Sequence, residues 1–350
     1  MLYLLPYELL VAIAEYCDQK TRKSLSLVSR RLRNPSQRVI FKTMNIPREI
    51  CGAFAVRGSG EHFLEMIQDD RLLSYIQTFI MSSALRRLET DTMELLFTAL
   101  HRMRPLRDIK LSNIRFTTTM LDRLCEVLST RPYTVELRCC VYPADYTFQQ
   151  ATLKIHRLWL EYKSISGAPP PAMSKLLVAI IERSLSSITS LTLLSCLGLL
   201  ASLGTMPRLT SLEIWSKSAE NDEGLRKFLV ANPQLVEFAL DRADCDLSLL
   251  PSSALPNLRT IRVNASLVPH LLQGRPVVKV KIGMLSRVKF MVDGLRALSR
   301  SATPIIDLTL HLPYYNTDVC ELLDAVVETV PHLERIWLYL RSEVRSILHF

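Results

Sequence analysis

The sequence contains none of the short motifs that mark an enzyme or a metal site. No G-x-S-x-G motif, phosphate loop, H-E-x-x-H motif or kinase signature occurs. No C-x-x-C pair or cysteine–histidine cluster has the spacing of zinc ligands, and the seven histidines are isolated. We therefore expect a protein without catalytic activity, metal ion or cofactor, in which the eight cysteines are reduced and mostly structural.

Segments typical of disorder or of a membrane span are also missing. Only 10 of the 350 residues are glycine, and no stretch combines low hydrophobicity with high net charge, which argues against extended disorder. Residues 184–207 carry no charge and exceed the roughly 20 residues that cross a bilayer. They are rich in serine and threonine, however, and we interpret them as a buried strand and its return segment. The sequence thus predicts a cytoplasmic or nuclear protein without membrane contact.

A repeated apolar pattern dominates what is present. The pattern apolar-x-x-apolar-x-apolar recurs along most of the chain, with a mean period of about 26 residues. The clearest copies follow a proline and begin at Leu106, Leu209, Leu235, Leu258 and Leu333. Further copies begin at Ile76, Thr134, Ile155, Ile188, Val277 and Ile305.

Helical periodicity fills the spaces between copies, at residues 93–103, 120–128, 173–185, 223–230, 288–298 and 319–330. Each repeat is therefore predicted to be a strand, a turn and a helix. This pattern resembles the leucine-rich repeat family, in particular its irregular members, over about three quarters of the chain. The resemblance implies an α/β solenoid; the alternative is a doubly wound sheet, which also alternates strands and helices. The in-register triplet favours the solenoid.

The repeat also predicts which side chains leave the core. Relative positions 0, 3 and 5 are apolar and face the core, so positions 2, 4 and 6 should line the inner surface of the solenoid. These outward positions hold seven acids and seven bases. A nucleic-acid track would need one sign of charge, so nucleic acid is an unlikely partner class despite the net charge of +9.

All three tryptophans fall at outward positions. Trp159, Trp215 and Trp337 occupy the predicted inner surface, and Tyr339 follows on the last copy. Exposed aromatic rings are enriched at binding hot spots, so these four residues are candidate contacts for a protein target. The alternative is that each ring lies against a neighbouring strand or loop.

Residues 3–46 do not follow the repeat and are predicted to form short helices. Pro6 stands at a helix start, Thr21 can cap a second helix, and that segment is expected to end before Asn34-Pro35. A unit of this size is near the lower limit for folding alone, so its apolar faces need another surface.

This segment resembles the F-box, through Leu5-Pro6-Tyr7-Glu8-Leu9-Leu10, Ile13, Tyr16-Cys17-Asp18 and residues 25–32. Arg22 stands where leucine is common, and Leu32 stands where tryptophan is common. The resemblance implies docking onto the Skp-type linker subunit of a ubiquitin ligase, and through it onto a cullin. The implied contacts are Leu5, Pro6, Glu8, Leu9, Ile13, Leu25 and Val28, although some of them can instead pack the module's own core.

Together these features predict an F-box-like module at 1–46, a connecting helical segment at 47–70 and a leucine-rich-repeat solenoid at 71–345. The expected function is that of a substrate adaptor in an SCF-type ligase, with an unknown protein target on the repeats. A repeat scaffold outside any ligase is the alternative.

Overall fold

The computed structural model describes residues 5–46, 67–82, 90–149, 152–162, 171–216, 222–241, 245–283, 288–312 and 319–340. The chain forms two compact units: residues 1–159 with 171–187, and residues 160–170 with 188–350. Most of the predicted connecting segment, residues 47–66, lies outside the described residues. The predicted domain boundaries at 46, 70 and 345 stay predictions.

Three helices begin the first unit: α1 (Tyr7–Tyr16), α2 (Gln19–Val28) and α3 (Arg30–Ile40). The predicted cap of the second helix was wrong, because the carboxylate of Asp18, not Thr21, accepts the amide hydrogen of Thr21 at 2.7 Å. Ser29 caps α3 in the same way, accepting from the amide of Leu32 at 3.2 Å. Asp18 thus caps the start of α2, and Ser29 caps the start of α3.

The predicted helix end before Pro35 was also wrong. Pro35 lies inside α3 and is buried. A proline in the first turn of a helix costs little stability, because the first amides of a helix have no intrahelical partner in any case. Pro35 lies beyond the first turn of α3, so its missing amide hydrogen removes one backbone hydrogen bond of the helix. Its buried neighbours Leu32, Ser36 and Val39 hold the helix across that gap.

A strand that the sequence did not predict follows α3. This strand, β1 (Thr43–Ile46), alternates exposed and buried side chains and pairs in parallel with β2 (Thr78–Ser82), Met44 lying opposite Phe79. It is only four residues long, so its alternation alone is a weak signal. The helical module therefore leads directly into the first strand of the repeats.

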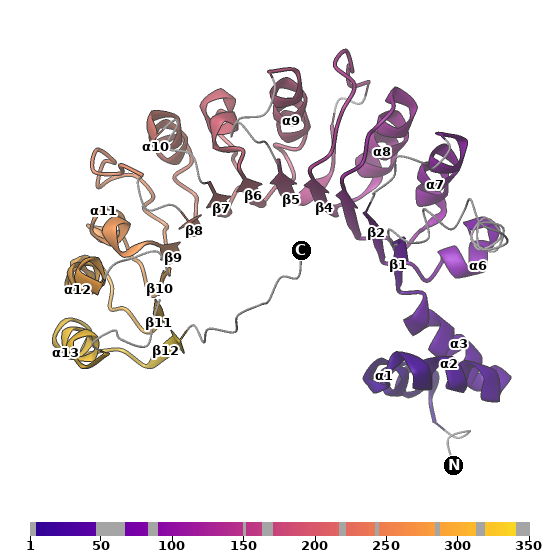
Figure 1. The fold of residues 1–350 in the computed structure, drawn as a ribbon, viewed down its shortest axis with the longest axis horizontal. Coiled ribbons are helices and arrows are strands. Elements are labelled where there is room, and N and C mark those ends of the chain that lie inside the picture. Colours follow the sequence, from indigo (N-terminus) through magenta and orange to yellow (C-terminus); the bar gives the residue numbers. More distant parts are fainter. Residues whose placement is uncertain are drawn as a thin grey trace, which may run out of the picture. The chain divides into compact units, whose positions relative to one another are not determined.

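The first unit continues with strands and helices in alternation: α6 (Asp70–Leu73), β2, α7 (Thr90–Arg102), β3 (Asp108–Ser112), α8 (Thr118–Thr130), β4 (Tyr133–Arg138), β5 (Ile155–Glu161) and α9 (Pro171–Arg183). Strands β1 to β4 pair in parallel in the order of the chain. Helices α7 and α8 lie on one side of these strands (Figure 1).

The second unit repeats this arrangement. It contains β6 (Ser190–Leu194), η2 (Leu197–Ser202), β7 (Ser211–Trp215), α10 (Asp222–Ala231), β8 (Glu237–Asp241), β9 (Thr260–Val263), η3 (Ala265–Leu267), α11 (Val268–Leu272), β10 (Lys279–Ile282), α12 (Val288–Arg296), η4 (Ala297–Arg300), β11 (Asp307–Leu312), α13 (Val319–Thr329) and β12 (Arg335–Leu340). Strands β6 to β12 again pair in parallel and in chain order. Residues 184–207 form β6 and η2, as predicted.

Sequential parallel strands with helices on one side confirm the leucine-rich-repeat type of solenoid. A doubly wound sheet would place helices on both faces, whereas α10, α12 and α13 all lie on the same side of their strands (Figure 1). The predicted frame is correct in β3, where Ile109 and Leu111 are fully buried and Lys110 between them is not. In β12, the last described strand, the core positions Ile336 and Leu338 are both partly exposed.

A left-handed residue ends several strands. Asn113, Cys139 and Ser195 follow β3, β4 and β6 and have φ of 56°, 51° and 56°. The amide of Asn113 donates to the carbonyl of Arg138, and that of Ser195 to the carbonyl of Trp215, both at 2.7 Å. The chain therefore turns after β3 and β6 while its backbone remains bonded to the next repeat.

Candidate docking and recognition surfaces

The α1 and α2 helices expose apolar side chains that their own core does not use. Leu10 and Ala14 are the buried residues of α1, and α2 has none. Exposed large apolar residues on the two helices are Tyr7, Leu9, Ile13, Tyr16, Leu27 and Val28. Solvent exposure of this much apolar side chain on two short helices is typical of an interaction surface.

The predicted linker contacts divide between this surface and the interior. Leu9 is 50% exposed and Val28 is 66% exposed, and Ile13, Pro6 and Glu8 are also exposed. Leu5 and Leu25 are partly buried. Sequence reasoning did not select Tyr16 and Leu27, which are more exposed than Leu9, Ile13 or Val28. The signal for Leu27 was ambiguous, because apolar periodicity alone does not separate a helix's internal face from a docking face.

Arg22 and Leu32, the two departures from the F-box pattern, both hold the helices together. Arg22 donates from Nε to the carbonyl of Ala14 at 2.7 Å and from Nη2 to the carbonyl of Glu15 at 2.8 Å. A cation at the last carbonyls of a helix is favourable, because they carry partial negative charge. Leu32 is buried in α3. At position 22, where the F-box pattern commonly has leucine, Arg22 therefore contacts α1 through hydrogen bonds to its last turn.

Trp159 lies on the sheet face away from the helices, which we call the open face, and is covered by an arginine. The guanidinium of Arg138 on β4 lies 5.0 Å from the ring centroid, within the range of a cation–π contact. Arg138 also pairs with Glu136 of its own strand, which Lys110 of β3 approaches at 3.5 Å. The ring is thus partly buried and lies beside a cluster of two bases and one acid.

Trp215 has a similar environment in the second unit. The guanidinium of Arg262 lies 4.8 Å from its ring centroid, and its Nε1 donates to Glu213 at 2.5 Å. Arg262 of β9 also bonds Glu213 of β7, although β8 lies between these strands. The contact is possible because the residue of β8 between them is Ala239, whose side chain is short.

Trp337 and Tyr339 of β12 are the most exposed of the predicted target contacts, at 54% and 52%. Tyr339 stacks on His311 of β11 with ring centroids 4.9 Å apart and an angle of 12° between the rings. Burial lowers the pKa of His311, and the positive charges of Arg262 and Lys281 lower it further. The four predicted rings therefore fall into two kinds, two covered by arginine and two largely open.

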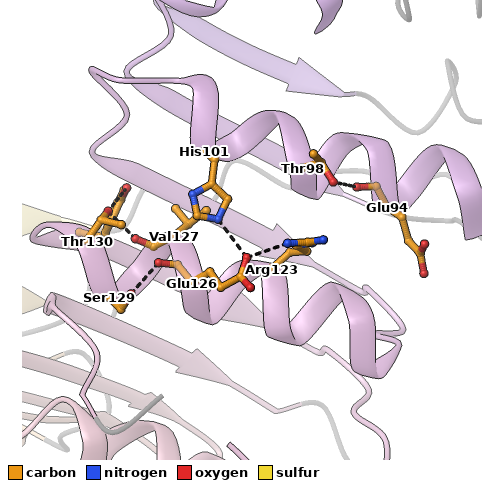
Figure 2. A network of polar contacts seen from close by, with 9 residues as sticks. Glu94, Thr98, His101, Arg123, Glu126, Val127, Ser129 and Thr130 are labelled. Carbon is orange, nitrogen blue, oxygen red and sulfur yellow. Dashed lines mark hydrogen bonds and ion pairs between the residues drawn. The ribbon is translucent and has the colours of Figure 1, made fainter. Parts of the chain in front are cut away.

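On the helices, charged side chains mainly join neighbouring repeats. Glu126 of α8 accepts from Arg123 at 3.0 Å and lies 3.3 Å from Nε2 of His101 on α7 (Figure 2). Arg123 and then His101 hold the pKa of the Glu126 carboxyl below its usual range. This cluster links α7 to α8 rather than forming a site.

Within the described part of the chain, no group of three or more His, Cys, Asp or Glu side chains is placed to hold a metal ion. Burial raises the pKa of the Cys125 thiol to about 11 and that of Cys140 to about 12, so both are poor nucleophiles near neutral pH. In the same residues, no helix is long and apolar enough to span a bilayer.

The fold and these surfaces define a repeat protein with an amino-terminal three-helix module whose apolar side chains remain exposed. Residues 2–42 match the model of the F-box domain, so the module is an F-box domain. The chain is also similar to a solved structure, the crystal structure of the Rad7 and Elc1 complex in yeast, with 11% identity, 93% of each chain covered and a TM-score of 0.34. No curated protein sequence matches the chain.

Proposed function

We propose that this protein is the substrate-recognition adaptor of an SCF-type cullin-RING ubiquitin ligase, acting in the cytoplasm or nucleus. The F-box domain would bind the Skp-type linker subunit and through it a cullin, while the repeats hold a protein target. The observation that carries the proposal is the F-box match at residues 2–42, together with the exposed apolar residues that α1 and α2 contribute. The adaptor itself would need no catalytic group, since transfer chemistry belongs to other subunits.

Within the F-box domain, the proposed linker contacts are Leu5, Pro6, Glu8, Leu9, Ile13, Leu25 and Val28. Leu9 and Val28 are the best test positions, because they lie on different helices and are exposed enough that substitution leaves the module's core intact. The proposed target contacts are Trp159, Trp215, Trp337 and Tyr339 on the open faces. Trp159 and Trp215 are each held by a neighbouring arginine and lose little conformational entropy on binding, whereas Trp337 and Tyr339 offer the larger exposed area.

The test is recovery of the linker subunit with the tagged full-length chain. Leu9→Asp combined with Val28→Asp should lower linker recovery at least about tenfold, because each carboxylate would have to be desolvated in an apolar interface. The matched control is Leu249→Asp with Val327→Asp, which makes the same two changes at positions of the second unit that are 71% and 75% exposed.

Unchanged recovery with the control and loss with the F-box variant would support the proposal. If the intact, folded chain recovers no linker subunit, the ligase function is wrong, and a repeat scaffold outside any ligase becomes the better account.

A further inference from the structure

The open face of the second unit carries separated charges. The outward positions on β7 and β8 are acidic and hold Glu213, Glu237 and Asp241. Those on β9 to β12 are mainly basic and hold Arg262, Lys279, Lys281 and Arg335. Among the described outward positions of β9 to β12, Asp307 is the one carboxylate. Two of the basic residues are already neutralised, Arg262 by Glu213 and Arg335 by Asp307 at 3.3 Å. Lys279 and Lys281 are exposed and form no ion pair with any described residue.

The strand register places Lys281 two strands away from Trp337, and Lys279 two strands away from Arg335. Lys281 of β10 lies opposite Thr309 of β11, which in turn lies opposite Trp337 of β12. Neighbouring strands are about 4.8 Å apart, so the backbone of Lys281 is about 10 Å from that of Trp337. Thr309 between them is short and buried. The exposed side chains of Lys281 and Trp337 therefore lie on either side of the short, buried Thr309.

We infer that this surface, the basic–aromatic face (Lys279, Lys281, His311, Arg335, Trp337 and Tyr339), binds an acidic peptide segment in which an anionic side chain is close to an aromatic or apolar one. The anion would pair with the two free lysines, and the apolar side chain would lie on Trp337 and Tyr339. An extended peptide could cross β10, β11 and β12, the three strands that carry the residues of this face. The inference rests on the proposed function, since such a segment would be the recognised part of the target.

The local electrostatics agree with this class of partner. Burial lowers the pKa of His311, and the nearby positive charges of Arg262 and Lys281 lower it further, so His311 adds little charge of its own while Lys281 stays available to an anion. A nucleic-acid strand fits less well, because Glu237 and Asp241 on the adjacent strand interrupt the positive charge that a row of phosphates would need. Carboxylates and phosphate groups share the required chemistry, so the anion can be either.

Fluorescence anisotropy with the full-length chain tests the inference. The probes are three labelled peptides of one serine–glycine background with a central phenylalanine, flanked by glutamates, by phosphoserines or by lysines. The acidic or the phosphorylated peptide should bind, with an affinity that falls as salt rises, and the lysine peptide should not. Which of the two anionic probes binds more tightly identifies the source of the negative charge.

Lys279→Glu with Lys281→Glu should weaken anionic-peptide binding at least about tenfold, and Trp337→Ala should weaken it about fivefold or more. The control Lys175→Glu with Lys227→Glu makes the same change in net charge on exposed lysines of α9 and α10 and should leave binding unchanged. The milder Lys279→Gln with Lys281→Gln gives the same direction of change if the charge-reversed chain fails to fold.

The inference is overturned if no anionic peptide binds better than the lysine peptide, if the control loses as much affinity as the test variant, or if a polyuridine probe binds in preference to both anionic peptides. Linker recovery is measured with the same preparations. Retained peptide binding without linker recovery would refute the ligase function alone, and the reverse result would refute the peptide surface alone.

Discussion

At the scale of single residues, Arg275 is a buried cation held by backbone carbonyls. Its side chain is 1% exposed, and it donates from Nε to Ala254, from Nη1 to His270 and from Nη2 to Pro251, each at 2.7 Å. Two carbonyls from the segment between β8 and β9 and one from α11 thus converge on one rigid guanidinium, a geometry that the compact ammonium of lysine does not match. Burial lowers the pKa of Arg275. Arg275 therefore links the segment between β8 and β9 to α11.

Replacing Arg275 by methionine should therefore destabilise the protein by about 3 kcal/mol, because one buried and two partly buried carbonyls lose their donor. Urea unfolding followed by circular dichroism measures the change. Arg259→Met is the control, since Arg259 is exposed and makes one long bond of 3.5 Å to Pro276. Equal midpoints for the two variants would show that the Arg275 bonds contribute little.

At the scale of elements, the α1–α2 junction depends on a polar contact. Arg22→Met would remove both hydrogen bonds to the last turn of α1 while keeping most of the side chain's volume. We expect the module to lose about 1 kcal/mol of local stability. Hydrogen exchange of the full-length chain should then be faster in α1 and α2 and unchanged in β7 to β9.

Arg38→Met provides the comparison, because Arg38 is exposed near the end of the same module. Identical exchange in α1 and α2 for the two variants would contradict the bridging role of Arg22.

The elements also show what the sequence could and could not predict. The predicted repeat starts all lie at or just before observed strands, because an apolar triplet repeated at one register constrains each strand independently. The frame of the Thr134 copy was wrong by two residues, since Val135 and Leu137 lie opposite Ile109 and Leu111. Strand β1 was missed, since four residues form a strand there only by pairing with β2, more than 30 positions along the chain. The arginine over Trp215 depends on Ala239 of an intervening strand, and a single repeat does not contain that information.

At the scale of the whole molecule, the account assigns binding to two surfaces of different chemistry. The proposed linker surface on α1 and α2 is apolar, with exposed leucine, isoleucine and valine side chains, whereas the proposed basic–aromatic face carries exposed lysines and largely open rings. Apolar interfaces respond weakly to salt and charged ones respond strongly. The two binding steps should therefore be separable by ionic strength in one preparation.

The central claim is that the F-box domain of this chain binds a Skp-type linker directly. Isothermal titration of the purified full-length chain with the purified linker subunit tests it without other cellular proteins. The account predicts a one-to-one complex with a negative heat-capacity change, because apolar side chains of α1 and α2 leave water on binding, and no measurable heat of binding for Leu9→Asp with Val28→Asp. A folded wild-type chain that forms no complex with the linker, or a complex that this double variant leaves unchanged, would contradict the account.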